Sequence, residues 1–363
     1  MLTVWGVMLK KHVYFFILFV LLLNGCNPAP QPVHQEKFYV FGTLVGVTFW
    51  DAPPEKVQAA SQMLQQTLQT MHTQWHAWQP SQLTTLNQAI AQGQALDEPD
   101  AQLVDMLQQA KHFSLQSDDL FNPAIGKLVA LWGFHNDEFT TQKPPEEEKV
   151  IALLAEKPSM QDLVITPHQI SANNPNIQLD LGGFAKGYAL DTVIAELQNM
   201  GIQNAIVNMG GNLKAIGQRN HQPWNIGIRH PRPTEDQSIL AAVAIQDEES
   251  VVTSGDYERY YEYNGQRYFH ILNPRTGHSP TQFVSVTVID KSAALADAAS
   301  TALMVAGIND WHRVAKQMNI KYALLVDTDG VVHVNPLMGK RVQFRPKQKP
   351  PIFISEPLID TTQ

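Results

Sequence analysis

The sequence predicts an α+β fold, in which helices and a mixed sheet occupy separate stretches of the chain. Hydrophobic residues make up 44% of 363 residues, which is enough to bury a core in one large domain or two ordinary ones. Beyond residue 160, short β-branched stretches alternate with glycine and proline turns, and two helical patterns interrupt them. A doubly wound α/β protein would instead alternate strands and helices along its whole length.

The first 25 residues have the pattern of a bacterial lipoprotein signal peptide. Two lysines precede an apolar run over residues 13–23, which has the length of a signal-peptide core and is short for a membrane span. Asn24 and the small residue Gly25 follow this run and precede Cys26. Cys26 is the only cysteine in the sequence, so we expect it to be lipidated. The alternative is an ordinary secretory signal with a chance cysteine. Residues 26–36 contain several prolines and are expected to form a lipidated tether.

Apolar residues at helical spacing predict four helices, over residues 55–72, 98–116, 185–199 and 292–306. In the first of them, one face carries Val57, Ala60, Leu64, Leu68 and Met71. A polar loop over residues 136–149 is expected to lead into a short helix that ends near Ala155.

Strands are predicted wherever β-branched and aromatic residues lie between turn residues. The first covers residues 38–50, with glycines at positions 42 and 46 that are typical of a bulge or a close backbone approach. The others cover residues 162–166, 177–181, 204–209, 212–217, 224–229, 239–245, 267–272 and 283–289. A single domain is expected over residues 37–340. Residues 341–363 are expected to be an extended or disordered C-terminal tail.

The stretch LDLGGFAKGYALD, residues 179–191, has the character of an anion-binding turn. Two glycines would let a phosphate approach the backbone, and Lys186 lies one helical turn further on, near the positive end of the helix dipole. The spacing matches neither the dinucleotide-binding fingerprint nor the P-loop. The alternative is that the glycine pair serves only helix packing.

Three further stretches carry possible chemistry. NMGGN, residues 208–212, is typical of a tight turn between two strands. His270 ends a predicted strand beside the turn NPRTG, where it is either a general base or a simple cap. Asp297 and Thr301 share one face of an apolar helix, and their oxygens are ligands suited to Mg²⁺. On spacing alone, Asp297 is equally well explained as a partner of a helix N-terminus.

Taken in order, these stretches resemble the ApbE family of FAD:protein FMN transferases over about residues 37–340. The landmarks are Phe41-Gly42-Thr43, HAWQPSQLTTLN, LFNPAIGKLVALWGF, LDLGGFAKGYALD, NMGGN, HILNPRTG and DAASTAL. The resemblance implies an ApbE-like α+β fold with mixed sheets, FAD in a central cleft and Mg²⁺ at its diphosphate.

The resemblance also implies roles for individual residues. The implied FAD-binding residues are Phe41 and Trp78 beside the ring systems, Leu120, Phe121 and Asn122 along the site, Asp180 as a hydrogen-bond partner, Lys186 and Leu272. The implied metal ligands are Asp297, Thr301 and the backbone carbonyl of Gly183, and the implied catalytic residues are His270 and Lys186. The chain departs from the family at Asn122 and Asn273, where Asp-Pro is usual, so neither position carries a charge.

The implied reaction is Mg²⁺-dependent transfer of the FMN moiety of FAD to a threonine or serine hydroxyl of a target protein, with release of AMP. Two alternatives stay open: hydrolysis of FAD to FMN and AMP, and a non-catalytic, lipid-anchored FAD-binding protein. A structural lipoprotein would leave the landmarks unexplained.

The expected partners are flavin-accepting subunits of membrane redox pumps. The expected location is the periplasmic side of a bacterial membrane, with the lipid anchor in the inner membrane. The formal net charge of −8 argues against a general nucleic-acid binder, because such proteins need a basic face.

Overall fold

The computed structural model describes residues 33–136, 143–235, 237–345 and 349–359. The expected signal peptide and Cys26 lie outside the described residues. Within the described ranges, no helix is long and apolar enough to cross a membrane.

Helices and strands follow one another along the chain without a regular alternation. The helices are α2 (Pro54–Trp75), α3 (Gln82–Ala91), α4 (Ala101–Gln116), α5 (Gly126–Leu131), α6 (Glu147–Ala155), the 3₁₀ helix η1 (Met160–Asp162), α7 (Ala185–Asn199), α8 (Ala293–Ala306), α9 (Trp311–Gln317) and α10 (Pro336–Arg341). The strands are β1 (Val33–Val40), β2 (Thr43–Trp50), β3 (Leu96–Asp97), β4 (Leu163–Ile165), β5 (Gln169–Ala172), β6 (Ala205–Met209), β7 (Asn212–Ile216), β8 (Trp224–Thr234), β9 (Gln237–Ile245), β10 (Ser250–Gly255), β11 (Tyr260–Tyr263), β12 (Gln266–Phe269), β13 (Phe283–Asp290), β14 (Tyr322–Asp327), β15 (Val332–Val334), β16 (Val342–Phe344) and β17 (Ile352–Ile354).

A nine-stranded sheet forms the centre of the molecule, in the order β1-β2-β6-β7-β10-β13-β14-β15-β17. Its neighbouring strands are antiparallel except for β15 and β17, which are parallel. The central strand β13 is buried along nearly its whole length because both of its faces are covered. This explains why its sequence is a continuous apolar run rather than an alternating one.

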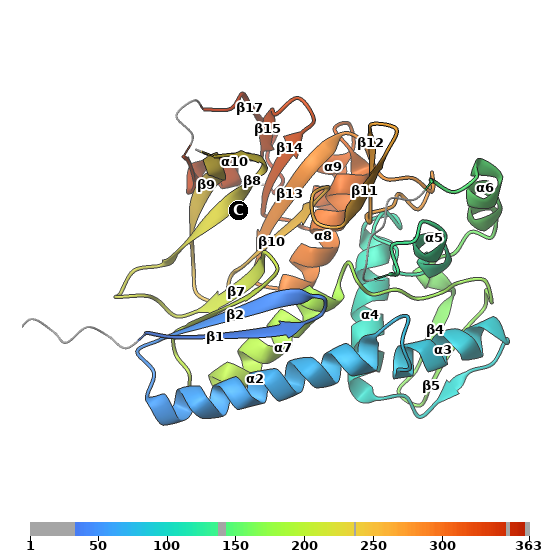
Figure 1. The fold of residues 1–363 in the computed structure, drawn as a ribbon, viewed down its shortest axis with the longest axis horizontal. Helices are drawn as coiled ribbons and strands as arrows, with labels where there is room; N and C mark the ends of the chain where they lie inside the picture. Colours follow the sequence, from blue (N-terminus) through green and yellow to red (C-terminus); the bar gives the residue numbers. More distant parts are fainter. Residues whose placement is uncertain (1–32, 137–142, 236, 346–348, 360–363) are drawn as a thin grey trace, which may run out of the picture.

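The two faces of the sheet pack against different layers. Alternate residues of β14 show this, since Leu325 joins the core under the helices whereas Leu324 and Val326 join the core under the small sheet β16-β9-β8. Helices α2, α7 and α8 pack together on the first side, and Figure 1 shows α2 lying along the lower edge of the molecule. The fold is therefore α+β, as predicted.

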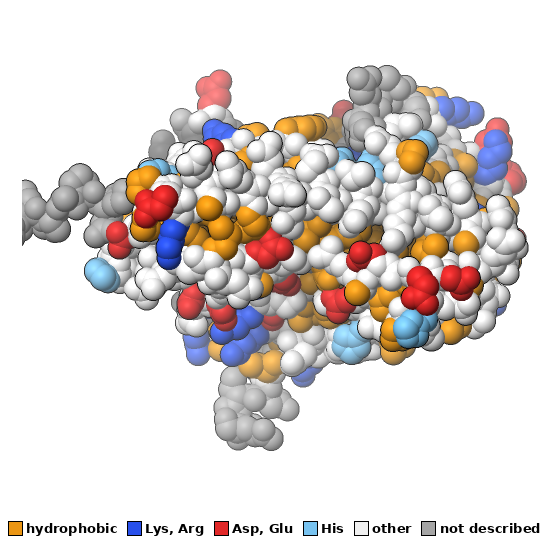
Figure 2. Space-filling view, turned by 90° about the horizontal axis from the view of Figure 1, so that it is seen from below, with side chains coloured by type: hydrophobic (Ala, Val, Ile, Leu, Met, Phe, Trp, Pro, Cys, Tyr) orange, Lys and Arg blue, Asp and Glu red, His pale blue; other side chains and the backbone are white. Residues whose placement is uncertain are grey.

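The outer face of the molecule near α2 is mostly neutral. Figure 2, seen from below, shows charged side chains of both signs scattered among neutral polar groups, and the lysines and arginines form no continuous patch on this face.

A smaller apolar cluster joins α5, α6, β11 and β12. It contains Trp132, Val150, Tyr261 and neighbouring side chains, and the indole nitrogen of Trp132 donates to the carbonyl oxygen of Gly277 at 2.8 Å. A Cβ atom at Gly277 would collide with Val150, so the glycine of the NPRTG turn is needed for this packing.

The helix predictions agree with the structure where apolar residues recur at helical spacing over many residues. The four predicted helices correspond to α2, α4, α7 and α8, with ends shifted by three residues or fewer, and the short helix before Ala155 corresponds to α6. Helix α3 was not predicted. It begins with a capping box in which the Ser81 side chain accepts from the Thr84 amide and the Thr84 hydroxyl accepts from the Ser81 amide.

Two strand predictions were wrong. The stretch 38–50 is two strands, because Phe41 and Gly42 both have positive φ (54° and 67°) and form a two-residue hairpin turn. The stretch 177–181 makes only an isolated bridge with Ile125. The backbone of Leu179 is instead held by the side chain of Asn87, which accepts from its amide at 2.7 Å and donates to its carbonyl at 2.9 Å.

The expected terminal segments are more ordered than the sequence indicated. Residues 33–36, assigned to the tether, form the first half of β1. In the C-terminal tail, β16 pairs with β9 and β17 pairs with β15. Leu358 is buried in the helix-side core, so the tail is an extended wrap that contributes to packing.

Candidate active site

A cavity of about 360 Å³ lies where the β1–β2 turn, the start of α7 and the middle of α8 meet. Its volume is in the range of small-molecule sites. The predicted site residues that line it are Phe41, Leu120, Phe121, Asn122, Asp180, Gly183, Lys186, His270, Leu272, Asp297 and Thr301. Residues from position 41 to position 301 therefore converge on one cavity.

Trp78 does not line the cavity. Its indole nitrogen donates to one carboxylate oxygen of Asp180 at 3.0 Å, and its ring packs against His135. The other oxygen of Asp180 accepts from the amide of Gly182 at 2.8 Å. Trp78 therefore lies behind Asp180 and holds that carboxylate in the cavity wall.

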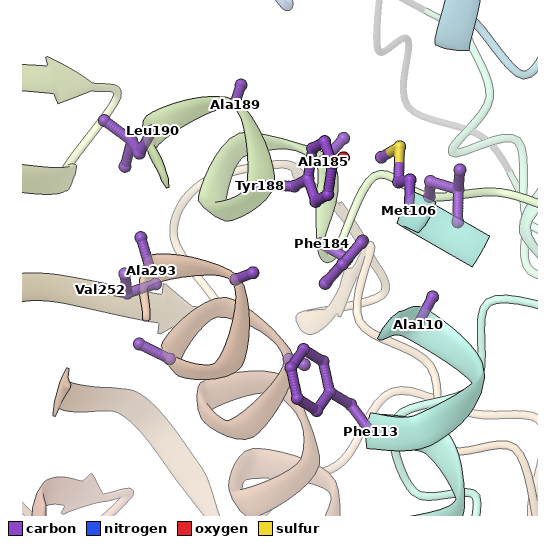
Figure 3. Packing of buried hydrophobic residues seen from close by; sticks show 14 of the residues in the cluster. Met106, Ala110, Phe113, Phe184, Ala185, Tyr188, Ala189, Leu190, Val252 and Ala293 are labelled. Carbon is purple, nitrogen blue, oxygen red and sulfur yellow. The ribbon is translucent and has the colours of Figure 1, made fainter. Parts of the chain in front are cut away.

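Phe184 anchors the turn that precedes α7. Its ring is fully buried, and it contacts the rings of Phe113, Phe121 and Tyr188 at centroid distances of 5.9–6.0 Å. Figure 3 shows Phe184 between the first turn of α7 and the helices α4 and α8. This apolar anchor keeps the Gly182–Gly183 backbone at the edge of the cavity.

Gly187 allows α7 and α8 to approach each other closely. A Cβ atom there would collide with the carbonyl of Ala293 and lie 2.8 Å from the Cβ of Asp297. Because the helices are this close, the amide of Gly187 donates to Asp297 Oδ2 at 2.9 Å. Gly187, which follows the glycine pair Gly182–Gly183, therefore serves the packing of α7 on α8 and also positions Asp297.

Asp297 is a buried carboxylate with two hydrogen bonds. Asp297 is only 3% exposed. Besides the contact of Oδ2 with Gly187, its Oδ1 accepts from the side-chain amide of Asn212 at 3.1 Å. Burial raises the pKa of Asp297, and Lys186 and the two hydrogen bonds partly offset this. A buried carboxylate with a raised pKa is stabilised by a nearby cation.

Three hydroxyl groups lie close together beside Asp297, one on β10 and two on α8. Ser254 lies 2.8 Å from the hydroxyl of Ser300 and 3.4 Å from that of Thr301. A Cβ atom built at Gly183 would be 3.6 Å from Thr301 Oγ1, so this turn faces the same hydroxyl.

The donor set fits a hard cation that shares its coordination with a substrate. Among the described residues, no three His, Cys, Asp or Glu side chains gather as a metal-binding group. The available oxygens are the carboxylate of Asp297, the hydroxyl of Thr301 and the carbonyl of Gly183. Mg²⁺ is commonly held by one or two carboxylates together with phosphate oxygens and water.

His270 presents a neutral imidazole to the cavity. Its Nδ1 lies 3.3 Å from the carbonyl oxygen of Arg259. Since a carbonyl oxygen only accepts, Nδ1 carries the proton and Nε2 is left as an acceptor. Burial, together with the positive charges of Arg259 and Lys186, holds the pKa of His270 well below its usual range.

The positive charge of Lys186 affects three titratable groups that line the cavity. It lowers the pKa of Asp297, of Glu258 and of His270, although burial raises the pKa of the two carboxyl groups overall. Its Nζ donates to the carbonyl of Gly182 at 3.4 Å. An anionic ligand bound in this cavity would therefore meet Lys186 beside the glycine turn.

The two asparagines that replace the family's usual aspartates have different environments. Asn122 is buried; its Nδ2 donates to the carbonyl of Pro158 at 2.8 Å and its Oδ1 accepts from the amide of Ala124 at 3.0 Å. Asn273 uses its Oδ1 to accept from the amide of Arg275 at 2.8 Å. The donor contact at Asn122 requires an amide, whereas the acceptor contact at Asn273 does not.

Several cavity residues were not identified from the sequence. Ser254 lies near the end of β10 and Glu258 and Arg259 follow that strand, and no spacing rule connects them with α8. Asn212 was considered only as part of a tight turn. The turn is present, with positive φ at Gly210 and Gly211, and Asn212 in addition binds Asp297.

The comparisons with known proteins agree with this geometry. The model of the ApbE family matches residues 41–325. The chain belongs to the ApbE family. This range contains every residue that lines the cavity.

Curated ApbE relatives are named for the reaction. The chain is 41% identical to the FAD:protein FMN transferase of Rhodobacter capsulatus over 319 residues, which are 87% of this chain but only 59% of that protein. It is 31% identical to the FAD:protein FMN transferase of Vibrio cholerae over 317 residues, 85% of this chain and 92% of that protein.

Solved ApbE structures have the same fold. The ApbE protein of Thermotoga maritima superposes with a TM-score of 0.78 at 26% identity, covering 87% of this chain and 100% of that one. The flavinyl transferase ApbE of Pseudomonas stutzeri gives 0.75 at 28% identity, covering 87% and 98%. Together these relatives support an enzyme that transfers FMN from FAD to a target protein.

Proposed function

We propose that the cavity binds FAD and that, with Mg²⁺, the enzyme transfers its FMN moiety to a threonine or serine hydroxyl of the target protein. A phosphodiester bond forms and AMP leaves. The observation that carries this proposal is the convergence of buried Asp297, the hydroxyl of Thr301 and neutral His270 on one cavity.

The proposed metal ligands are Asp297, Thr301 and the carbonyl oxygen of Gly183. When bound, Mg²⁺ would neutralise charge on the diphosphate, which favours phosphoryl transfer. With a single protein carboxylate in the set, we expect the cation to bind more tightly in the presence of FAD.

His270 is the proposed general base. The acceptor hydroxyl oxygen would attack the phosphorus on the FMN side of FAD, and its proton would pass to Nε2 of His270. The bond from that phosphorus to the bridging oxygen would break, and AMP would leave with that oxygen. Lys186 would hold the diphosphate and offset its charge, so positioning and electrostatics supply most of the catalysis.

The remaining predicted residues would bind the rest of FAD. Phe41 offers an aromatic surface at the hairpin turn, and Asp180 offers a carboxylate oriented by Trp78. The backbone and side chains of Leu120, Phe121, Asn122 and Leu272 complete the wall.

Hydrolysis of FAD to FMN and AMP is the competing activity. It would use the same residues with water in place of the hydroxyl, and it becomes the main reaction if no acceptor reaches the cavity. A carrier that binds FAD without reaction would not need a base in the same cavity as the proposed metal ligands.

We further propose that Cys26 carries a lipid and holds the enzyme on the periplasmic side of a bacterial inner membrane. Its targets there would be flavin-accepting subunits of membrane redox pumps. The apolar core that precedes Cys26 and the absence of any other cysteine support this location.

Replacing Asp297 with alanine tests the metal assignment. We expect flavin transfer to fall by about a hundredfold or more, because removing one strong electrostatic contact to a reacting group typically costs that much. Isothermal titration should show weaker Mg²⁺ binding in the presence of FAD, and circular dichroism should show an intact fold. Transfer at the parent rate would show that Asp297 does not bind the metal.

A further inference from the structure

We propose that the outer face of the β1–β2 hairpin tip, formed by Tyr39 and Leu44, is the surface on which the flavin-accepting protein docks through apolar side chains of its own. This inference rests on the proposed transfer function, since only a transferase needs to hold a second protein at its cavity.

The pairing register places Tyr39 and Leu44 directly opposite each other on one face of the hairpin. The next pair toward the turn, Val40 and Thr43, faces the other side, where Val40 is buried in the core and Thr43 lines the cavity. Side chains alternate between faces along a strand, so Tyr39 and Leu44 point outward. Tyr39 is 75% exposed and Leu44 is 55% exposed.

The outer face of the hairpin is apolar at the turn, polar along its middle, and apolar again at the far end, where Val33 lies opposite Trp50. Further from the turn, the same face carries Lys37 opposite Gly46 and Gln35 opposite Thr48. A solvated strand face is expected to remain polar, so a paired tyrosine and leucine at its functional end call for another explanation.

Glycines near these two side chains leave open space beside the backbone. Cβ atoms built at Gly42, Gly46 and Gly211 would meet nothing within 4 Å. Leu44 is flanked by Gly42 and Gly46 in the chain, and β2 pairs with β6, which ends at the Gly210–Gly211 turn. A polypeptide could therefore approach the backbone closely on both sides of Leu44.

The position of the face identifies its occupant. Phe41, Gly42 and Thr43, which join the two strands, line the cavity. Tyr39 is two residues from Phe41, roughly 7 Å along an extended strand. A protein held at Tyr39 and Leu44 thus lies within a few residues of the site where its hydroxyl must react.

Two other occupants are less well placed. The chain's own N-terminal segment joins β1 at Val33, six residues before Tyr39 and roughly 20 Å away along the strand. Figure 1 shows this end of the hairpin at the periphery and the turn near the centre of the molecule. A second copy of the chain that met this face with its own hairpin would bring only another Tyr39 and Leu44, which is a small apolar area for a stable contact between two copies.

The test uses the double variant Tyr39→Ser, Leu44→Ser and a matched control, Ile151→Ser. Ile151 lies on α6 with 56% exposure, almost the same as Leu44, and does not line the cavity. Flavin transfer is measured at varied concentrations of a flavin-accepting protein that the parent chain labels, and FAD binding is measured separately by fluorescence.

We expect the double variant to raise KM for the acceptor protein about tenfold, a typical effect for losing apolar anchors of an interface. Its kcat at saturating acceptor and its affinity for FAD should equal those of the parent and of the control. A second variant, Gly46→Gln, adds bulk where nothing is in contact, and it should raise KM in the same way without loss of thermal stability.

Unchanged KM in both variants would overturn the docking surface while leaving the transferase intact. Weaker FAD binding in the double variant would also overturn it, since the effect would then act through the cavity. An effect that disappears when residues 1–32 are removed would assign the face to the chain's own N-terminal segment. A parent chain that labels no acceptor would instead overturn the proposed function itself.

Discussion

At the scale of single residues, Asn122 shows how one donor atom decides which side chain fits. Its amide donates to the carbonyl of Pro158 and accepts from the amide of Ala124, so both of its ends are used. An aspartate would keep the second contact and place a carboxylate oxygen against the carbonyl oxygen. The departure from the family's Asp-Pro at this position is therefore consistent with the local packing in this chain.

We predict that Asn122→Asp destabilises the fold by about 1–3 kcal/mol at pH 7, the usual cost of a buried polar group without its partner. The loss should shrink as the pH falls, because a protonated carboxyl group can donate to Pro158. Thermal unfolding at pH 7 and pH 5 measures both effects. Asn273→Asp is the matched control and should change stability by no more than about 0.5 kcal/mol, since only its acceptor oxygen is in use. Equal effects of the two substitutions would contradict this explanation.

His270 leads to a prediction about pH. Its lowered pKa means that the imidazole stays neutral, and able to accept a proton, until the pH falls far below 6.5. We therefore expect kcat/KM for FAD to stay level between pH 8 and pH 6 and to fall only at lower pH. Bound diphosphate brings negative charge near the imidazole, so the acidic limb of kcat should lie at higher pH than that of kcat/KM. His270→Ala should slow transfer more than it weakens FAD binding. A loss of kcat/KM centred near pH 6.5, absent from His270→Ala, would show an ordinary histidine pKa.

Most of the candidate site could be predicted residue by residue, and the exceptions have a physical cause. Asp297, Thr301 and Lys186 stand out because charged or hydroxyl groups are unusual beside glycine turns or on apolar helices. Ser254 and Glu258 do not stand out, because Ser254 reaches Ser300 of α8 only once β10 has paired with β13, and Glu258 lines the cavity from the segment that follows β10. Trp78 was expected beside the ligand, but it does not line the cavity and instead donates to Asp180, which does.

At the scale of elements, the crossing of α7 and α8 determines the geometry of the site. Asp191 on α7 accepts from the amides of Ala293 and Ala294, both at 3.0 Å, and so caps the start of α8. Gly187, one turn earlier on α7, lets the helices touch and donates to Asp297. Helix α8 is thus held at two points by α7.

We predict that Gly187→Ala separates these helices and costs about 1–3 kcal/mol, as overpacking usually does. Transfer should fall along with stability, because the Gly187 amide moves away from Asp297. Gly46→Ala is the control, since a Cβ atom there meets nothing within 4 Å. Differential scanning calorimetry together with the transfer rate measures both consequences. A Gly187→Ala variant as stable and as active as Gly46→Ala would show that the helices do not need this contact.

The longer helices were predictable because their signal is local. The apolar positions of α2 recur every three or four residues, and all of Val57, Leu64 and Leu68 are buried as expected. Strand boundaries were less predictable where a turn has an unusual sequence. Phe41 in a positive-φ turn position is uncommon for an aromatic residue, so the sequence did not indicate a hairpin there.

At the scale of the whole molecule, the cavity depends on strand order. The nine-stranded sheet places β2, β6 and β7 beside β10 and β13, so that turns from residues 41–43 and 210–212 reach the same cavity as α8. This order joins strands that are distant in sequence, and local patterns do not specify such pairings. That these distant stretches form one site was predicted from the resemblance to the family and not from hydrophobic periodicity.

We propose that this chain transfers FMN from FAD to a protein in a reaction that needs Mg²⁺. The most direct test incubates the chain without residues 1–26 with FAD, Mg²⁺ and an outward-facing subunit of a membrane redox pump. Flavin fluorescence of the denatured subunit and release of AMP are followed in parallel, with a chelator as control. We predict a fluorescent subunit and an equal amount of AMP, both lost when Mg²⁺ is removed. AMP release with no labelled subunit would indicate a hydrolase, and bound FAD with neither product would contradict the proposed enzyme and indicate a protein that only binds FAD.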